Sequence, residues 1–309
     1  MTATPPTARG LAAALTAYIA WGVFPLYLYP LTGVPGSQFV AHRIAWSCPF
    51  LLALLLLRGE LGTLTRVFAS PRLLGRLILT ALLISANWLV YVWSVTHGHV
   101  VDSSLGYYIN PLVNVLLGVL VLNERLNRPQ QIAVALAAVA VAYLTLLDGR
   151  PPWIAGALAL LFSLYGLLRK TMSVAALPGL ATETLLLMPL AVAYLVWCQA
   201  RGVGALGAGS AAVDALLLGS GVVTAVPLFL FTYGARALPY STVGVLQYIA
   251  PTLQLLCAVL FFHESFAPAR VAGFALIWMA LAIYAADGLW RARRARLASA
   301  GRTAPALGR

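Results

Sequence analysis

The chain has 309 residues, of which 61% are apolar and only 9% are charged. Soluble domains carry roughly 25% charged residues, so this composition excludes a water-soluble globular protein. The net charge of +12 does not indicate nucleic-acid binding, because the arginines lie at the ends of apolar runs and in a C-terminal segment. Most of the chain consists of apolar runs of about 20 residues, the length with which a helix spans a bilayer.

Ten such apolar segments follow one another along the chain. Their residues do not alternate between apolar and polar, as they would in the strands of a transmembrane barrel. Helices are then the remaining way to satisfy the backbone in lipid. The sequence therefore predicts an all-α integral membrane protein with ten transmembrane helices. The predicted spans are 11–30, 38–57, 73–95, 104–122, 130–147, 152–168, 180–199, 213–234, 241–262 and 269–288.

Lysine and arginine are distributed unevenly between the two sides that these spans define. With the N-terminus placed in the cytoplasm, sixteen of the 20 basic residues fall in cytoplasmic segments and four fall outside. Cytoplasmic loops of membrane proteins are enriched in basic residues. We therefore expect both termini to be cytoplasmic, with residues 1–10 as an N-terminal segment and residues 289–309 as a basic, disordered tail.

The chain also repeats itself at an offset of 140 residues. The Tyr-Ile-x-Pro sequence at 108–111 aligns with the same pattern at 248–251, and Glu124 aligns with Glu264. Two repeats result, 11–147 and 152–288, and each holds five predicted helices. Because five is odd, the second repeat enters the membrane from the opposite side. Inverted repeats of this kind are a transporter architecture, with the substrate site near the midplane where the halves meet.

Several longer stretches carry a family resemblance. They are His42-Arg43-Ile44-Ala45-Trp46-Ser47, Asn87-Trp88-Leu89, Gly106-Tyr107-Tyr108-Ile109-Asn110-Pro111-Leu112-Val113-Asn114 and Gln247-Tyr248-Ile249-Ala250-Pro251-Thr252. With these stretches, the chain from Gly10 to about Arg291 resembles the EamA-type drug/metabolite transporters, and within them the RarD group. The resemblance implies a ten-helix permease of the bacterial inner membrane that acts as an exporter. It does not imply a particular substrate.

Polar and aromatic side chains recur on single faces of several predicted helices. Polar groups within the hydrocarbon tend to face the bundle interior, so we expect a central cavity between the first, third, fourth, sixth, eighth and ninth helices. The alternative is that the amides only form hydrogen bonds between helices. A cavity of aromatic rings and amides suits small amphipathic solutes, such as amino acids or chloramphenicol-like compounds. The candidate substrate-binding residues are Tyr18, Trp21, Asn87, Trp88, Tyr91, Tyr107, Asn110, Asn114, Tyr165, Gln247, Tyr248, Gln254 and Arg43.

Arg43 lies about one turn into the second predicted helix. Its planar guanidinium suits a substrate carboxylate, and extension to the outer headgroups is the alternative. Its repeat equivalent is Glu183, at the cytoplasmic end of the seventh helix, and we expect the two to lie too far apart to form a pair. All eight acidic residues fall in loops or near helix ends. This distribution favours facilitated diffusion or exchange over transport coupled to a proton on a midplane acid.

Pro111 and Pro251 lie inside predicted helices at equivalent positions of the two repeats. A proline lacks an amide proton and clashes with the carbonyl four residues earlier, which here belongs to Tyr107 and to Gln247. We expect both helices to bend there, with the freed carbonyls facing the pathway and the bends acting as gates. Static bends retained for packing are the alternative.

Other classes of function leave weaker signals. An ATP-driven pump needs a Gly-Lys-Ser/Thr loop, and Lys170 is the only lysine in the chain. His97 and Asp102 have the His-x4-Asp spacing of glycerolipid acyltransferases, so a membrane-embedded lipid-modifying enzyme is the alternative function. The three cysteines lie in different spans without metal-binding spacing, and no cofactor or metal is predicted. The expected partners are a small-molecule substrate and the lipid bilayer.

Overall fold

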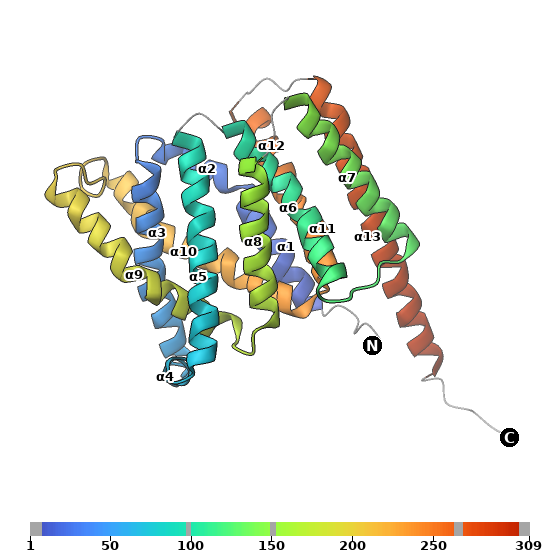
Figure 1. Ribbon diagram of the computed structural model, residues 1–309, viewed down its shortest axis with the longest axis horizontal. Coiled ribbons are helices and arrows are strands. Elements are labelled where there is room, and N and C mark those ends of the chain that lie inside the picture. The colour runs from blue at the N-terminus through green and yellow to red at the C-terminus, as the bar shows by residue number, and fades with distance from the viewer. Residues whose placement is uncertain (1–7, 97–99, 149–152, 263–267, 303–309) are drawn as a thin grey trace.

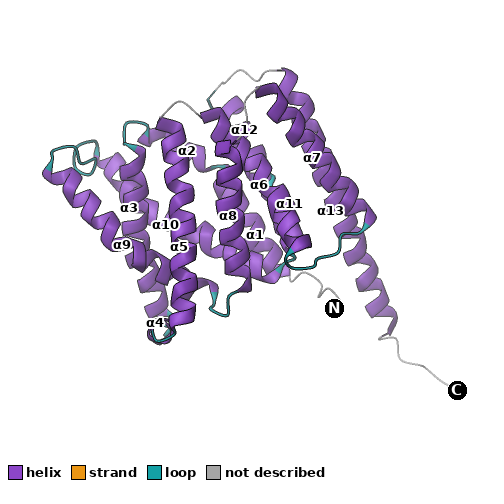
Figure 2. Cartoon of the chain, viewed as in Figure 1, coloured by secondary structure: helices purple, strands orange, loops and turns teal. Residues whose placement is uncertain are grey.

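A computed structural model describes residues 8–96, 100–148, 153–262 and 268–302. Every regular element in these ranges is a helix (Figures 1 and 2). In chain order the helices are α1 (Ala8–Gly22), α2 (Phe24–Leu28), η1 (Tyr29–Leu31), α3 (Gly36–Leu57), α4 (Gly62–Phe68), α5 (Pro71–Thr96), α6 (Val100–Leu120), α7 (Arg128–Asp148), α8 (Trp153–Thr171), α9 (Ala176–Ala200), α10 (Ala211–Ala237), α11 (Tyr240–Gln247), α12 (Ile249–Leu260) and α13 (Pro268–Arg302).

Each predicted apolar segment lies on one or more of these helices. Seven helices are individually long and apolar enough to cross a bilayer, and α1 together with the α2–η1 segment, bent by 43°, makes an eighth. Helix α6 contributes a shorter apolar stretch, Gly106–Leu120, and the ninth predicted segment is divided into α11 and α12. By length and composition, seven or eight spans are therefore supported in the described part of the chain. The expected count of ten is not confirmed.

The described helices enclose four apolar clusters, of which two are large enough to form cores. Helix α3 packs against α9 and α10, whereas α7 and α13 pack against each other at the opposite side of the molecule (Figure 1). Helix α8 lies between these groups and contacts both α5 and α6. The larger core is formed mainly by α1, α3, α8, α9 and α10, and the smaller one by α6, α7, α11 and α13.

Helices α3 and α10 cross at very short distance where Gly221 faces α3. A Cβ atom on Gly221 would lie 2.2 Å from the carbonyl carbon of Trp46 and 2.5 Å from the amide nitrogen of Ser47. The Ser47 hydroxyl donates a hydrogen bond of 2.9 Å to the Gly221 carbonyl. Small residues and hydrogen bonds of this kind drive helix association in lipid. The crossing thus brings Arg43 and Thr224, about one turn away on either helix, into contact.

The two repeat-equivalent prolines have different surroundings. Helix α6 continues through Pro111, whereas the corresponding segment of the second repeat breaks at Tyr248, three residues before Pro251. Pro251 therefore lies in the first turn of α12, where a missing amide proton leaves no internal hydrogen bond unmade. The bend expected in the second repeat takes the form of this break, and the gating role of both prolines stays a prediction.

Helix α13 extends beyond its apolar part into the basic C-terminal segment. The expectation that this segment is disordered is wrong as far as Arg302, because the helix continues to that residue. Alanine, arginine and leucine, which dominate here, favour the helical state. Asp287 and Arg291 add an ion pair of 2.8 Å one turn apart, and the Arg294 guanidinium lies 3.8 Å from the centre of the Trp290 ring.

Candidate functional site

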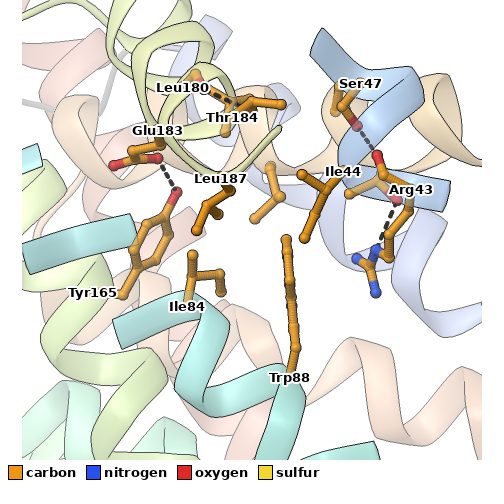
Figure 3. Close-up of a pocket in the computed structure, with 13 residues that line it drawn as sticks. Arg43, Ile44, Ser47, Ile84, Trp88, Tyr165, Leu180, Glu183, Thr184 and Leu187 are labelled. Atoms are coloured by element: carbon orange, nitrogen blue, oxygen red, sulfur yellow. Dashed lines mark hydrogen bonds between the residues drawn. The ribbon is translucent and has the colours of Figure 1, made fainter. Parts of the chain in front are cut away.

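A small cavity of about 20 Å³ lies between α3, α5, α8, α9 and α10. Its walls are mostly aliphatic and aromatic, and polar groups stand on opposite sides of it (Figure 3). The lining residues are Arg43, Ile44 and Ser47 of α3, Ile84 and Trp88 of α5, Tyr165 of α8, Leu180, Glu183, Thr184 and Leu187 of α9, and Thr224, Ala225 and Leu228 of α10. We call this space the central cavity.

The central cavity is placed differently from the sequence-based expectation. The second and seventh predicted helices, α3 and α9, were expected to stand outside it, and both supply lining residues. The first, fourth and ninth were expected to line it, and the described residues of α1, α6, α11 and α12 do not. The difference arises because the polar residues of α3 and α9 lie two to three turns inside these helices, at the depth where they face α10.

Arg43 stands on one side of the central cavity without an acidic partner among the described side chains. Its Nε atom donates a hydrogen bond of 3.0 Å to Thr224 Oγ1. Its guanidinium carbon lies 4.4 Å from the centre of the Trp88 ring, a cation–π contact. An intramembrane cation held this way marks a functional position by default. Arg43 is directed into the bundle, among α5 and α10, and not along the path to the headgroups.

Glu183 stands on the other side and is 2% exposed. Thr80 Oγ1 donates a hydrogen bond of 2.5 Å to Glu183 Oε1, and the Tyr165 hydroxyl donates one of 3.3 Å to Oε2 (Figure 3). Arg169 Nε lies 3.5 Å from Oε1 and forms the ion pair of this side chain. Side chains of two helices, α5 and α8, therefore hold the carboxylate.

The expected position of Glu183 at a helix end is wrong. Helix α9 begins at Ala176, four residues earlier than predicted, so Glu183 lies two turns inside it and not near its end. The first nine residues of α9 are all buried, because α3, α4, α5 and α10 pack around this part of the helix. Glu183 and Arg43 do not form an ion pair with each other, yet both line the same cavity.

Arg169 is a functional candidate that sequence analysis missed. It lies one residue beyond the predicted sixth span, 152–168, but α8 continues to Thr171 and the Arg169 side chain is fully buried. Its Nη2 atom donates a hydrogen bond of 3.0 Å to the Ala176 carbonyl. Gly179 leaves room for the guanidinium, since a Cβ there would lie 2.1 Å from Nη1. In the sequence, Arg169, Gly179 and Glu183 stand near one another, but their contact depends on the turn that brings α8 and α9 together.

The predicted amides join helices and do not line the central cavity. Asn87 and Asn110 donate hydrogen bonds of 2.9 Å to the carbonyls of Leu158 and Ala159 on α8. Asn114 donates one of 2.8 Å to Gln247 Oε1, and Gln254 donates one of 3.1 Å to the Trp21 carbonyl. These bonds connect α5 with α8, α6 with α8, α6 with α11, and α12 with α1. They are the bonds expected if the amides serve helix packing.

The predicted aromatic residues divide between the cavity and the cores. Trp88 and Tyr165 line the central cavity. Tyr18 and Trp21 pack with Phe162 and Phe231 in the larger core, and the Tyr18 hydroxyl donates to the Val243 carbonyl at 3.0 Å.

The other predicted tyrosines lie at two further positions. The ring centres of Tyr91 and Tyr107 are 6.3 Å apart. Tyr248 and Pro111 line a second, smaller and apolar cavity of about 10 Å³ between α6, α7, α11 and α13. Of the alternative enzymatic pair, His97 lies outside the described residues, and the side chain of Asp102 does as well.

Comparisons with known proteins agree with the membrane architecture. The profile of the EamA-like transporter family matches residues 8–146. The RarD protein of Streptomyces exfoliatus is 46% identical over 289 residues, which are 93% of this chain and 91% of that protein. The RarD protein of Escherichia coli is 39% identical over 288 residues, 93% of this chain and 97% of its own. A chloramphenicol-sensitive protein RarD of Pseudomonas aeruginosa is 34% identical over 283 residues, 88% of this chain and 92% of its own.

A solved crystal structure resembles the fold, with a TM-score of 0.69 at 19% identity, and covers 89% of this chain and 96% of its own. Together with the apolar helices, the full-length relatives identify a multi-pass protein of the bacterial inner membrane. A further relative from Pseudomonas aeruginosa, 46% identical over 94% of this chain and 98% of its own, is named an uncharacterized transporter. The chain belongs to the EamA-like transporter family, with RarD proteins among its full-length relatives.

Proposed function

We propose that this protein is a secondary transporter that moves small amphipathic metabolites or drugs by alternating access at the central cavity, as an exporter or exchanger. The observation that carries the proposal is the cavity itself. It combines aliphatic walls with Arg43 on one side and Glu183 on the other. Ligand sites in proteins are typically mostly apolar with a few placed polar groups that fix orientation.

The proposed architecture is ten spans in two inverted five-helix repeats. Three pairs of repeat-equivalent helices pack against each other: α3 with α9, α6 with α11, and α7 with α13. Such contacts are expected around a two-fold axis that relates the two halves. Glu124, beyond the end of α6, accepts hydrogen bonds from the amides of Tyr240 and Ser241 at the start of α11, so these two helices run in opposite directions. Antiparallel equivalents support inverted repeats.

The chemistry of the cavity supports an amphipathic substrate. The guanidinium of Arg43 suits a carboxylate or another acceptor group, while Ile44, Ile84 and Leu187 suit an apolar body. Amino acids and chloramphenicol-like compounds combine both features. Of the thirteen candidate residues, Arg43, Trp88 and Tyr165 line the central cavity, which must widen before such a molecule contacts them.

Counterflow in proteoliposomes tests the proposal. After a thermal-shift screen with amino acids, nucleosides and phenicols, vesicles loaded with unlabelled chloramphenicol or phenylalanine receive the radiolabelled compound outside. We expect saturable counterflow. Arg43→Ala removes a charge-assisted hydrogen bond of about 1.5–3 kcal/mol, which raises KM by about 10- to 100-fold.

A matched pair of tryptophan variants locates the site. Trp88→Ala should slow counterflow, whereas Trp197→Ala should not, because Trp197 is 52% exposed on α9 and does not line the central cavity. Absence of counterflow for every compound that shifts the melting temperature would refute the transporter proposal. Flux that does not saturate would indicate a channel.

A further inference from the structure

The ion pair between Glu183 and Arg169 is only partly satisfied. Good hydrogen bonds between a charged nitrogen and a carboxylate are about 2.7–2.9 Å long, whereas Arg169 Nε lies 3.5 Å from Glu183 Oε1. Arg169 Nη1 is buried and has no hydrogen-bond partner among the described residues. Two buried charges stabilise a structure only when geometry is good and their remaining donors and acceptors are paired. The ion pair therefore holds α8 against α9 more weakly than a well-formed buried ion pair would.

Glu183 is the member of the pair that the central cavity reaches. It belongs to the cavity lining, and Arg169 does not. Among the described lining residues Glu183 is the only carboxylate, and Arg43 is the only cation. A water molecule or ligand in the cavity thus meets the carboxylate without first displacing Arg169.

The surroundings of Glu183 are otherwise cationic or neutral. Helix α8 presents Tyr165 and Arg169, α3 presents Arg43 across the cavity, and α5 presents the Thr80 hydroxyl. Arg236 of α10 is engaged with the carbonyls of Met172 and Val174, and Arg66 of α4 is exposed. Because arginine stays charged in proteins, Glu183 is the group of this cluster whose charge is able to change. Gain of a proton at Glu183 removes the attraction that holds Arg169.

We propose that Glu183 is the proton-binding residue that couples transport to proton movement. The inference rests on the proposed transport function. A proton from water in the central cavity binds a Glu183 carboxylate oxygen, the ion pair with Arg169 is lost, and α8 and α9 are free to move apart. Return of that proton to water on the other side of the membrane restores the carboxylate and the ion pair. The sequence-based preference for uncoupled diffusion or exchange is replaced by coupling through this residue.

The first test needs no substrate. Infrared difference spectra of the purified protein, recorded while the pH is lowered within the range where it stays folded, detect the C=O band of a buried protonated carboxyl group. We expect this band in the parental protein and in Asp214→Asn, whose carboxylate binds the Gly207 amide outside the cavity. We expect it to be absent in Glu183→Gln. The same band in Glu183→Gln, or no such band in the parental protein, overturns the proposal.

The second test measures coupling in proteoliposomes with radiolabelled chloramphenicol. For one proton per substrate at zero membrane potential, a gradient of one pH unit supports an accumulation ratio of about 10. The parental protein and Asp214→Asn should approach this ratio and show counterflow that depends on pH. Glu183→Gln should give a ratio of about 1 and pH-independent counterflow. Gradient-driven accumulation by Glu183→Gln overturns the proposal.

A double variant keeps the test valid if Glu183→Gln alone fails to fold. Arg169→Met combined with Glu183→Gln removes both buried charges, a change that proteins tolerate better than loss of one partner. It should also lack the infrared band and accumulation. Absence of counterflow in the parental protein would count against the proposed transporter function, whereas the infrared result stands for or against Glu183 by itself.

Discussion

Substitution of Gly221 by alanine tests the arrangement of the helices around the central cavity. The new methyl group would lie 2.2 Å from the carbonyl carbon of Trp46 and 2.5 Å from the amide nitrogen of Ser47. Attractive contact between such atoms begins at about 3.5 Å, so α3 and α10 must separate by roughly 1 Å. No side-chain rotation relieves this clash, because the atoms met are backbone.

Two opposing effects determine the magnitude. Overpacking of a tight interface costs about 1–3 kcal/mol, while alanine favours a helix over glycine by about 1 kcal/mol. We expect Gly221→Ala to lower the free energy of unfolding by up to about 2 kcal/mol as the balance of these terms. The same displacement lengthens the 3.0 Å bond between Arg43 and Thr224, so counterflow should slow as well.

Gly219→Ala is the matched control on the same helix. A Cβ at this position would meet only the Tyr27 hydroxyl, at 3.6 Å, so the variant should gain up to about 1 kcal/mol from helix propensity. Unfolding of both variants and the parent is followed by tryptophan fluorescence in detergent micelles. If Gly221→Ala proves as stable as Gly219→Ala, the close crossing of α3 and α10 is wrong.

Three further predictions concern the buried polar groups and the broken helix. Arg169→Ala should destabilise the protein by about 3–5 kcal/mol because Glu183 is left buried and uncompensated, and detergent unfolding that shows a smaller loss than for Arg169→Met/Glu183→Gln would contradict this. A double-mutant cycle of Asn114→Ala and Gln247→Ala should give a coupling energy of about 0.6 kcal/mol, with a measured value near zero arguing against their hydrogen bond. Pro251→Ala restores an amide proton for the Gln247 carbonyl, so counterflow should slow if the break between α11 and α12 is a gate, and a parental rate would exclude that role.

The helices could be predicted from the sequence more accurately than the site. The apolar segments were recognisable because hydropathy over about 20 residues is a local property of the chain. The start of α9 was placed four residues late, since residues 176–179 include Pro178 and Gly179 and look like a loop in isolation. Neighbouring helices bury these residues, and α9 includes them. Glu183 therefore lies inside α9 and lines the central cavity, although it was expected near a helix end.

For the amides, too, the helix face could be predicted from the sequence, but the hydrogen-bond partner could not. Asn87 and Asn110 were recognised as polar residues on inner faces, and both are turned toward α8. Periodicity tells which residues share a face, but it does not tell which carbonyl stands opposite. Only the packing of α5 and α6 on α8 decided that the carbonyls of Leu158 and Ala159 accept these bonds and that the amides stay outside the central cavity.

Composition and spacing along the chain are enough to predict the membrane class, most of the helix positions and the repeat of the Tyr-Ile-x-Pro pattern. Which polar groups share the central cavity depends instead on how the helices pack. Arg43 and Thr224 are 181 residues apart, and Thr80 and Glu183 are 103 residues apart. Burial and pairing of a charge depend on such distant neighbours, and a local pattern carries no information about them.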